Sequence, residues 1–583
     1  MTPKVRLRLA EAIFLVAILI VVTRLFYWQI IKGDSLEIAG QSQYNQKSVT
    51  LPSRGKIISI DGFPLVSNKQ SYELSIDTKG LNIPKENLAN KISGALMKDL
   101  NLGLSASLSG ELTDIEREKL AKEIINNKIE NSNAQWMIIS DRIEESTKKA
   151  IEEMNLKGLY FTPKEQRYYP EGSMSAQLLG FVGKDQFGDG KGYFGIEGAY
   201  DRQLKGKSGF SLEEKDAQGK PILLGSKKVI VKENGRDLIL NIDRTTQFIV
   251  DEKLKKGIEK YGAKQGSVIV MDPKTGAILA MSSFPSYDPN KYSAYDKNLF
   301  RNPIVAESYE PGSTFKILVM AAGVNEGVVK PDTKCDKCSG PREIADYTIR
   351  TWNNQYYPET TMTDVIKHSD NTGMIFVEEM LGKDKFVKYL KDFGFGEATN
   401  IELEEESSPL LKSSWSVLDL ATSSFGQGIA VTPIQMARAA SVIANGGKLM
   451  EPHVVAKIRE ANGKEINIPP KIIKDVIRPG TAKVIAEMMI NAVDNGESKF
   501  FKPAGYRIAG KTGTAQIPVK GYYDASKTVA SFVGFAPADN PKFLILVILT
   551  EPSTSQWGSE TAAPLFFSIA GELFNYYKIP PTN

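Results

Sequence analysis

Cysteine and histidine are scarce in this chain of 583 residues, which holds two of each. A structural zinc site usually needs four Cys or His ligands, and neither His368 nor His453 stands at ligand spacing from another such residue. The sequence therefore gives no support for a metal site, and no cofactor is expected. So few cysteines also fit an exported protein whose fold does not depend on a disulfide framework.

The two cysteines, Cys335 and Cys338, form the motif "CDKC" in a stretch that is typical of a loop. A thioredoxin-type redox motif would need a βαβ context, which this stretch does not offer. Three interpretations stay open for the pair: a local disulfide, two free thiols, or part of a metal site.

Net charge is also small, since 73 basic residues stand against 69 acidic ones, a formal charge of +4. That balance gives no general case for nucleic acid as a partner. A phosphate-binding glycine loop is not evident either, because "GDGKGYFG" lacks the strand-then-helix context that such a loop requires. The chain contains no internal repeat and no low-complexity tract.

The N-terminus carries a long hydrophobic run behind a basic start. Lys4, Arg6 and Arg8 precede an apolar stretch at 9–31, which is long enough to span a membrane and ends in aromatic residues. The residues after the run are too large for a signal-peptidase site. We therefore expect a cytoplasmic tail at 1–8, an uncleaved transmembrane anchor at 9–31, and an extracytoplasmic remainder. The alternative is a buried N-terminal helix of a soluble protein.

The rest of the chain divides into two regions that differ in their sequence pattern. Residues 32–235 are mixed and loop-rich, with expected helices at 113–127 and 140–154 and expected strands at 71–77 and 157–163. This region concentrates no nucleophiles and is interpreted as a support. Residues 236–583 alternate strands and helices, which predicts an α+β domain with a sheet covered by helices. The whole is an α+β multidomain protein.

The stretch "YEPGSTFK" places Ser313 and Lys316 three residues apart, at the predicted first turn of a helix buried in the core. Residues at that spacing share one helix face, and the free N–H groups of a helix start favour a forming anion. A buried lysine can lose its proton and serve as base to a serine. The structural alternative is a capping serine beside a surface lysine.

Two further motifs follow in order. "KHSDNTG" contains Ser369 and Asn371, and "IAGKTGTAQ" contains a K-T-G motif that begins at Lys511. S-x-x-K, S-x-N and K-T-G in this order form the active-site set of the serine acyltransferases that react with penicillin. Each motif is weak alone, but the ordered triple within one domain is specific.

The chemistry explains why these residue types recur together. Ser313 would attack a peptide carbonyl and form an acyl-enzyme, with Lys316 accepting its proton. Lys511, a second cation, would help to lower the pKa of Lys316. Ser369 would relay the proton to the leaving amine, and Asn371 would hydrogen-bond the substrate backbone.

The K-T-G motif is interpreted as an edge strand that binds the substrate. Gly513 would let the substrate approach the backbone closely, and Lys511, Thr512 and Thr514 would bind its terminal carboxylate. The backbone N–H groups of Ser313 and Thr514 are predicted to form the oxyanion hole.

Over nearly its whole length the chain resembles the class B penicillin-binding proteins, which are membrane-anchored D,D-transpeptidases. "LPSRGKIISIDGFPLVSN" matches the family's R-G-x-I box, although Ser59 and Ile60 stand where an Asp-Arg pair is usual, and Gln177 replaces a common His. "FGQGIAVTPIQMARA" and "WGSETAAPLF" match the transpeptidase domain. The pedestal motifs, for which a structural role is expected, include Arg167, Gly195, Glu197, Tyr200, Asp201 and Leu204.

This resemblance implies a pedestal at 32–235 and a β-lactamase-like transpeptidase domain at 236–583. It implies stem peptides ending in D-Ala-D-Ala and β-lactams as ligands. A SEDS-family glycosyltransferase of the FtsW or RodA type and other divisome or elongasome proteins would be partners, besides membrane lipid. "YEPGSTFK" favours the division type (FtsI-type) over the elongation type.

Two other functions compete with this interpretation. A β-lactamase would need a carboxylate that activates water for deacylation, and no E-x-x-L-N-like segment lies between Ser369 and Lys511; "EATNIELEEE" is acidic but does not match. A non-catalytic β-lactam sensor would need a signalling route, which a single anchor does not provide.

Overall fold

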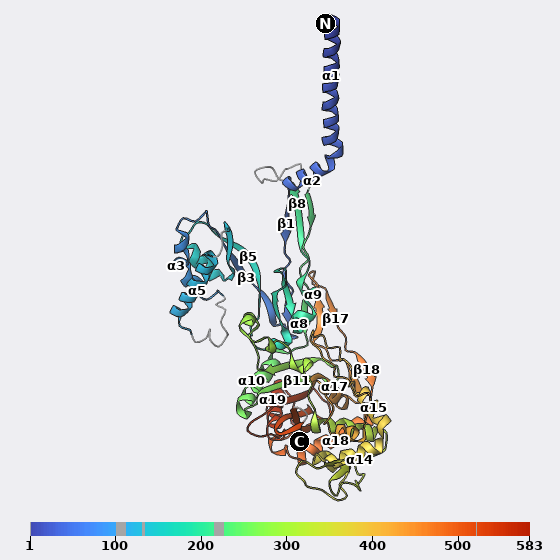
Figure 1. Ribbon diagram of the computed structural model, residues 1–583. Helices are drawn as coiled ribbons and strands as arrows, with labels where there is room; N and C mark the ends of the chain where they lie inside the picture. The colour runs from blue at the N-terminus through green and yellow to red at the C-terminus, as the bar shows by residue number, and fades with distance from the viewer. Residues whose placement is uncertain (1, 101–111, 131–133, 215–226, 520–521, 583) are drawn as a thin grey trace. The chain divides into compact units, whose positions relative to one another are not determined.

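The computed structural model describes residues 2–100, 112–130, 134–214, 227–519 and 522–582. Their contacts form two compact units, Met1–Arg54 with Lys205–Gly235 and Gly55–Leu204 with Arg236–Asn583. Figure 1 shows the elements of the chain, coloured from the N-terminus to the C-terminus. The predicted domain limits at residues 8, 31 and 235 stay predictions.

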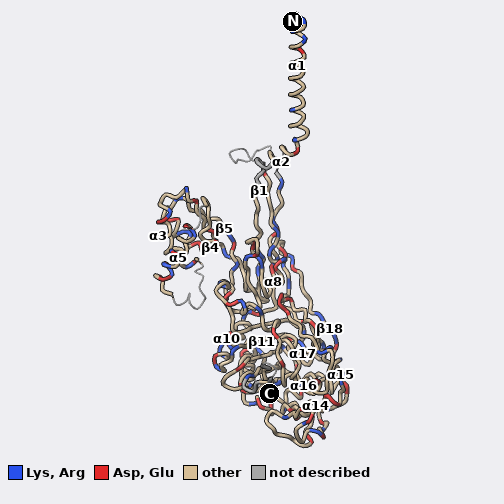
Figure 2. Tube along the Cα trace, in the orientation of Figure 1, with Lys and Arg blue, Asp and Glu red and all other residues tan. Residues whose placement is uncertain are grey.

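The first unit begins with the apolar helix. Helix α1 (Pro3–Phe26) continues through a π-helical turn (Tyr27–Ile31) and has no buried residue. The stretch Pro3–Ile31 has a mean hydropathy of 2.4, long and apolar enough to cross a membrane. Figure 2 shows it mostly free of charged residues between its ends. Helix α2 (Gly33–Tyr44) and the antiparallel sheet β1 (Asn45–Thr50), β8 (Gly209–Glu214), β9 (Lys227–Ile230) complete this unit.

The second unit contains a small lobe built on a long strand. β3 (Pro64–Asp77) pairs with both β4 (Trp136–Ile143) and β5 (Leu159–Tyr168). The helices are α3 (Lys85–Leu96), α5 (Asp114–Glu130) and α6 (Glu145–Glu152). The helix predicted at 140–154 is wrong in its first part, because residues 140–143 complete strand β4 and pair with β3; the helix expected at 113–127 is confirmed.

The pedestal motifs have the structural role expected of them. Arg167 Nε donates to Glu197 Oε1 at 2.6 Å, and both side chains are buried. Gly192 N donates to Asp201 Oδ1 at 2.8 Å. Arg167 lies on β5, while Gly192, Glu197 and Asp201 lie on the short elements β7 (Gly190–Tyr193), α8 (Gly195–Ala199) and α9 (Asp201–Lys205). Two more short elements, α7 (Ala176–Leu179) and β6 (Phe181–Lys184), precede them.

A five-stranded antiparallel sheet forms the centre of the C-terminal part, residues 236–583. Alternate residues of its strands face opposite sides. Val268 and Val270 pack in one cluster with helices α10 (Arg244–Tyr261) and α19 (Ala562–Tyr576). Ile269 and Met271 belong to the larger core with α12 (Lys316–Asn325), α14 (Asn371–Leu381), α17 (Pro433–Ala444) and α18 (Pro479–Asn495). The sheet covered by helices is thus confirmed. Its order is β12 (Ile278–Phe284), β11 (Gln265–Met271), β21 (Phe543–Thr550), β20 (Tyr522–Ala536), β19 (Ala509–Val519).

The helices of this part are α10 (Arg244–Tyr261), α11 (Pro303–Ala306), α12 (Lys316–Asn325), α13 (Met362–Lys367), α14 (Asn371–Leu381), α15 (Lys383–Asp392), α16 (Val417–Ser423), α17 (Pro433–Ala444), α18 (Pro479–Asn495) and α19 (Ala562–Tyr576), with 3₁₀ turns η2 (Pro289–Ala294), η3 (Lys297–Leu299), η4 (Gly312–Phe315) and η5 (Lys499–Phe501). Further strands are β2 (Ile57–Ile58), β10 (Asp237–Leu240), β13 (Arg342–Ile344), β14 (Tyr347–Ile349), β15 (Lys448–Met450), β16 (Val455–Arg459), β17 (Glu465–Asn467) and β18 (Ile472–Asp475). Cys335 and Cys338 are joined by a disulfide, which decides among the three interpretations of "CDKC".

Candidate active site

Ser313 lies in the 3₁₀ turn η4, directly before the core helix α12, and not in the first α-helical turn as predicted. Gly312 adopts φ +56°, which turns the chain sharply ahead of Ser313. The next residues wind tightly before the α-helix begins at Lys316. Residues 316–323 are all buried, which confirms the core helix and places the Lys316 side chain inside the protein.

The second motif occupies the connection between α13 and α14. Asp370 caps α14 by accepting the backbone N–H groups of Thr372 at 2.7 Å and Gly373 at 3.2 Å. Ser369, just before the cap, adopts φ +55°, an uncommon conformation for a residue with a side chain. The cap and this turn together hold Ser369 and Asn371 on either side of Asp370.

The third motif lies on β19, an edge strand of the five-stranded sheet, as predicted. A Cβ on Gly513 would come within 2.3 Å of Ser531 Oγ and 2.8 Å of Thr314 Cγ2. The glycine is therefore required by the packing of β19 against β20 and the η4 turn, a reason that the sequence did not indicate. Its predicted role in substrate approach remains a prediction.

The three motifs meet around the hydroxyl group of Ser369. Lys316 Nζ donates to Ser369 O at 2.6 Å, to Asn371 Oδ1 at 2.7 Å and to Ser369 Oγ at 3.3 Å. Lys511 Nζ donates to the same Ser369 Oγ at 3.0 Å and to Thr512 O and Oγ1, both at 3.1 Å. One hydroxyl thus connects two buried lysines from different elements.

Burial changes the protonation of both lysines. It lowers the pKa of Lys316 well below the usual value, and the positive charge of Lys511 lowers it further. Burial also lowers the pKa of Lys511, to about 8. The negative charge of Glu497 raises the pKa of both lysines and so opposes part of this lowering. A neutral lysine at this site is therefore accessible near neutral pH.

The turn that carries Ser313 packs closely against β19. A Cβ on Gly312 would stand 2.8 Å from Thr514 O, so only glycine permits this approach. Gly312 N also donates to Gly426 O at 3.0 Å, which ties the turn to the "FGQG" segment. Thr514 Oγ1 accepts a hydrogen bond from Gly558 N at 3.0 Å. Ser313 and Thr514, the predicted oxyanion-hole residues, thus belong to neighbouring segments.

Glu497 is the residue near this site that motif analysis missed. It lies between α18 and η5, and its carboxylate hydrogen-bonds Ser559 while acting electrostatically on both lysines. No motif marks it, because the sequence separates it from Lys316 and only the fold brings the two together. Its position 14 residues before Lys511 is not a recognisable spacing.

Aromatic residues surround the Ser369 turn. Trp352 Nε1 donates to His368 O at 3.2 Å, and the Trp352 ring meets Trp557 edge-on at 5.1 Å between centroids. The His368 ring stacks on Tyr357 at 4.5 Å, and burial lowers the pKa of the imidazole. His368 is therefore packed beside the Ser369 turn, and that it is a polar neighbour and not a base stays a prediction.

Comparison with known proteins places this geometry in a family. Residues 266–571 match the family model "Penicillin binding protein transpeptidase domain", and residues 49–240 match "Penicillin-binding Protein dimerisation domain". Among curated proteins, Stage V sporulation protein D of Bacillus subtilis is 34% identical over 562 residues, covering 95% of this chain and 83% of that protein.

Two further comparisons agree. A protein of Mesostigma viride called Peptidoglycan D,D-transpeptidase FtsI homolog is 30% identical and covers 96% of this chain and 94% of its own length. The crystal structure of a peptidoglycan synthetase from Bifidobacterium adolescentis has the same fold, with a TM-score of 0.71 at 24% identity, over 92% of this chain and 98% of that one. The chain accordingly belongs to the class B penicillin-binding proteins of the division type.

Proposed function

We propose that this chain cross-links peptidoglycan stem peptides ending in D-Ala-D-Ala during septal wall synthesis, through an acyl-enzyme on Ser313. The observation that carries the proposal is the Ser369 hydroxyl, held between Lys316 at 3.3 Å and Lys511 at 3.0 Å. It connects a candidate base to a candidate proton donor. Curated relatives that are called peptidoglycan D,D-transpeptidases support the reaction class.

In the first half-reaction, Ser313 Oγ attacks the carbonyl between the two D-Ala residues, and its proton passes to neutral Lys316. The bonds from Lys316 Nζ to Ser369 O at 2.6 Å and Asn371 Oδ1 at 2.7 Å occupy two N–H donors and leave the lone pair for the incoming proton. Asn371 Nδ2 is itself held by Arg350 O at 2.8 Å. Asn371 thus orients Lys316 in addition to its predicted contact with substrate.

The proton then moves through Ser369 to the amine of the leaving D-Ala, and the acyl group stays on Ser313. In the second half-reaction an acceptor amine attacks the acyl carbon and loses a proton by the same route in reverse. Ser313 regains its proton as the C–O bond breaks and the new amide forms. The charge on the carbonyl oxygen would be stabilised by the N–H groups of Ser313 and Thr514.

The terminal carboxylate of the donor peptide would bind at β19. Lys511 and Thr512 provide a cation and a hydroxyl there, and their contact at 3.1 Å presents them together. Thr514 Oγ already accepts from Gly558 N, so its hydroxyl proton remains for a carboxylate oxygen.

Mapping of a penicillin adduct tests the mechanism. The purified full chain, labelled with a fluorescent penicillin and digested, should give one adduct, on Ser313. Ser313→Ala should remove labelling while its melting temperature stays within about 2 °C of wild type, since Ser313 is only half-buried. Ser369→Ala keeps the nucleophile but removes the proposed proton relay, so it should be labelled on Ser313 more slowly than the wild type. An adduct on Ser369 would contradict the assignment.

The orientation and the partner are also proposals. The basic residues in the first turns of α1, Lys4, Arg6 and Arg8, favour a cytoplasmic N-terminus and an extracytoplasmic catalytic part. A transpeptidase acts on glycan strands that another enzyme polymerises, and the resemblance makes this enzyme a SEDS-family glycosyltransferase. The pedestal has no chemistry of its own, so we propose that it docks this partner.

Charge reversal on exposed pedestal residues separates docking from folding. Such a change should leave penicillin acylation of the isolated chain intact and lower cross-linking or glycan synthesis when the chain and partner are reconstituted together. Equal loss in both assays would mean that the pedestal only stabilises the fold, and no loss at several exposed positions would move the docking surface elsewhere.

A further inference from the structure

Two tryptophans stand beside the Ser369 turn. Trp352 Nε1 donates to His368 O at 3.2 Å, so Trp352 lies next to the residue that precedes Ser369. Its ring meets the Trp557 ring edge-on, with 5.1 Å between centroids. Trp352 is 43% exposed and Trp557 is partly exposed, so solvent reaches both residues. The pair therefore lies at the solvent-facing edge of the turn that carries Ser369.

The same pair is attached to the K-T-G strand. Gly558 follows Trp557, and its backbone N–H donates to Thr514 Oγ1 at 3.0 Å. A Cβ on Gly558 would stand only 2.2 Å from Gly513 O, so this segment packs directly on β19. The two tryptophans thus connect the Ser369 turn with β19, two of the three elements that form the active site.

Glu560 adds a negative charge beside the pair. It is exposed, and its Oε2 accepts from Ser555 Oγ at 2.5 Å. Ser555 Oγ in turn accepts from Trp557 N at 3.2 Å, which keeps the carboxylate close to Trp557. Glu560 forms no ion pair with another described residue, so its charge is available to a ligand. The same charge raises the pKa of Glu497, which shows that it acts on the active site.

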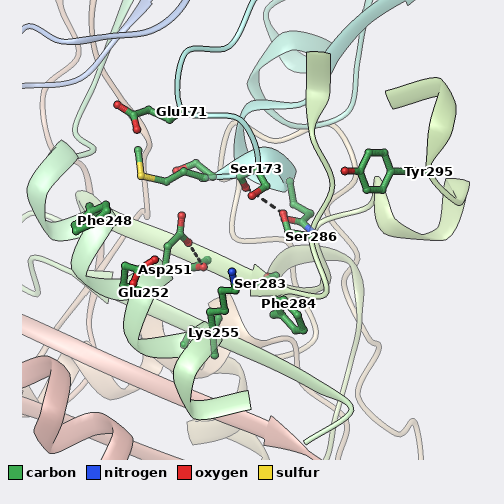
Figure 3. A pocket seen from close by; sticks show the side chains of 15 residues that line it. Glu171, Ser173, Phe248, Asp251, Glu252, Lys255, Ser283, Phe284, Ser286 and Tyr295 are labelled. Atoms are coloured by element: carbon green, nitrogen blue, oxygen red, sulfur yellow. Dashed lines mark hydrogen bonds between the residues drawn. The ribbon is translucent and has the colours of Figure 1, made fainter. Parts of the chain in front are cut away.

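Not every carboxylate beside a cavity is available in this way. Asp251 lines a cavity of about 330 Å³ formed by the segment 171–177, helix α10 and strand β12 (Figure 3). Its carboxyl accepts hydrogen bonds from Ser282 Oγ and from the backbone of Ser175, and its Oδ2 is buried. Asp251 therefore contributes to the fold, whereas Glu560 faces solvent.

We propose that Trp352, Trp557 and Glu560 bind the amino group of the acceptor peptide as its ammonium, an inference that rests on the proposed transpeptidase function. An ammonium donates to a carboxylate and is attracted to the face of a tryptophan ring. In an edge-on pair, the ring that contributes its edge keeps both faces free. The leaving and the incoming amine both exchange a proton with Ser369 in the proposed mechanism, so the acceptor has to arrive beside this residue.

The protons of the acceptor are accounted for as follows. The bound ammonium gives one proton to solvent, and the neutral amine attacks the acyl carbon. Its second proton passes through Ser369 and Lys316 to Ser313 Oγ as the ester bond breaks and the new amide forms. The site thus acts by holding the amine close to the acyl-enzyme, and its loss should weaken acceptor binding.

Competition between an amine and water for the acyl-enzyme tests the proposal. A thioester of N-acetyl-D-alanine acylates the purified full chain in detergent, and D-alaninamide, mainly an ammonium at pH 7, is the acceptor. The ratio of amide to acid product does not depend on how fast the acyl-enzyme forms. Glu560→Gln and Trp557→Leu should each raise the half-saturating D-alaninamide concentration by about threefold or more. Trp557→Phe, which keeps a ring face, should raise it less than Trp557→Leu.

Glu551→Gln is the matched control. Glu551 lies in the same segment, but its carboxylate already pairs with Lys264 at 2.6 Å, so this change should leave the D-alaninamide dependence as in the wild type. D-lactamide, which carries a hydroxyl in place of the ammonium, separates charge from shape, and Glu560→Gln should not change its use.

Three results would overturn the proposal: an unchanged D-alaninamide dependence in both Glu560→Gln and Trp557→Leu, an equal change with D-lactamide, or an acyl-enzyme that never transfers to D-alaninamide. Penicillin labelling at Ser313 shows that the active site of each variant is intact. Absence of that label in the wild type would contradict the proposed function instead, so the two failures are distinguishable.

Discussion

At the scale of single residues, two buried lysines share one serine hydroxyl, and their charges determine when either can act as a base. Neutral Lys316 is the reactive form, and its lowered pKa makes that form available well below the usual lysine pKa of about 10.4. The same shift affects stability. Between about 8, the pKa of folded Lys511, and the unfolded value, the unfolded chain binds more protons, so stability rises with pH in that window.

Substitutions at Lys511 and Glu497 should move the pH dependence of acylation in opposite directions. Lys511→Gln removes a positive charge that lowers the pKa of Lys316, so the rising limb of the acylation rate moves to higher pH. The maximal rate should also fall by about 10²-fold or more, since a proton-transfer group is lost. Glu497→Gln removes a negative charge that raises both lysine pKa values. The rise of the acylation rate with pH should therefore move to lower pH. The measurement is stopped-flow β-lactam acylation against pH; shifts in the same direction would contradict the electrostatic argument.

The lifetime of the penicilloyl adduct is a second prediction at this scale. The acidic segment that might have supplied a deacylating carboxylate is used structurally: Glu404 accepts from Phe194 N at 2.8 Å and Glu405 from Gly195 N at 3.0 Å. The adduct should therefore persist for many minutes. Intact-mass spectrometry at successive times after labelling measures its lifetime. Glu497→Gln should not lengthen it. Release within seconds, abolished by that substitution, would support a β-lactamase instead.

At the scale of elements, the site depends on the close packing of the η4 turn against strand β19. Both contributing glycines, Gly312 and Gly513, leave no room for a Cβ. The alternating core of the sheet and the buried face of α12 hold these two elements in place. Ser313 is thus positioned by contacts that lie outside the reacting groups.

Gly513→Ala tests this packing. The added methyl would overlap Ser531 Oγ and Thr314 Cγ2, so it should destabilise the chain by about 1–3 kcal/mol and slow acylation by displacing the η4 turn. Gly571→Ala is the control: it lies inside α19 with no atom within 4 Å of the new Cβ, so it should be neutral or stabilise by up to about 1 kcal/mol. Thermal unfolding and acylation rates are measured on both. An unchanged rate in Gly513→Ala would show that the turn is not held by β19.

At the scale of the whole molecule, an apolar helix joins the catalytic part to a membrane. The stretch Pro3–Ile31 is the span candidate among the described residues. Its length exceeds the roughly 20 residues that a bilayer requires. With this stretch as a single span, the rest of the chain is expected on one side of the membrane.

Protease accessibility tests that topology. Protease added to protoplasts or spheroplasts should digest almost the whole chain, because only about eight residues are expected inside. A cytoplasmic marker protein should remain intact in the same sample, and detergent should expose it. A large protected fragment of this chain would reverse the orientation.

Much of this protein could be predicted from its sequence, since the relevant signals are local. The alternation of strand and helix patterns indicated a sheet covered by helices, and the long apolar run at 9–31 indicated α1. The order of three short motifs indicated Ser313, Lys316 and Lys511. Residues 140–143 were mistaken for helix because their pairing partner, β3, lies far away in the sequence.

What the sequence by itself determined is the set of reactive groups and the type of the elements that carry them. Only the tertiary structure decided that Ser369 Oγ joins both lysines, that Glu497 acts on them, and that Gly513 is required by Ser531 and Thr314. It also decided that Cys335 and Cys338 form a disulfide. The physical reason is that burial, charge and close approach depend on which distant segments pack together, and local patterns do not carry that information.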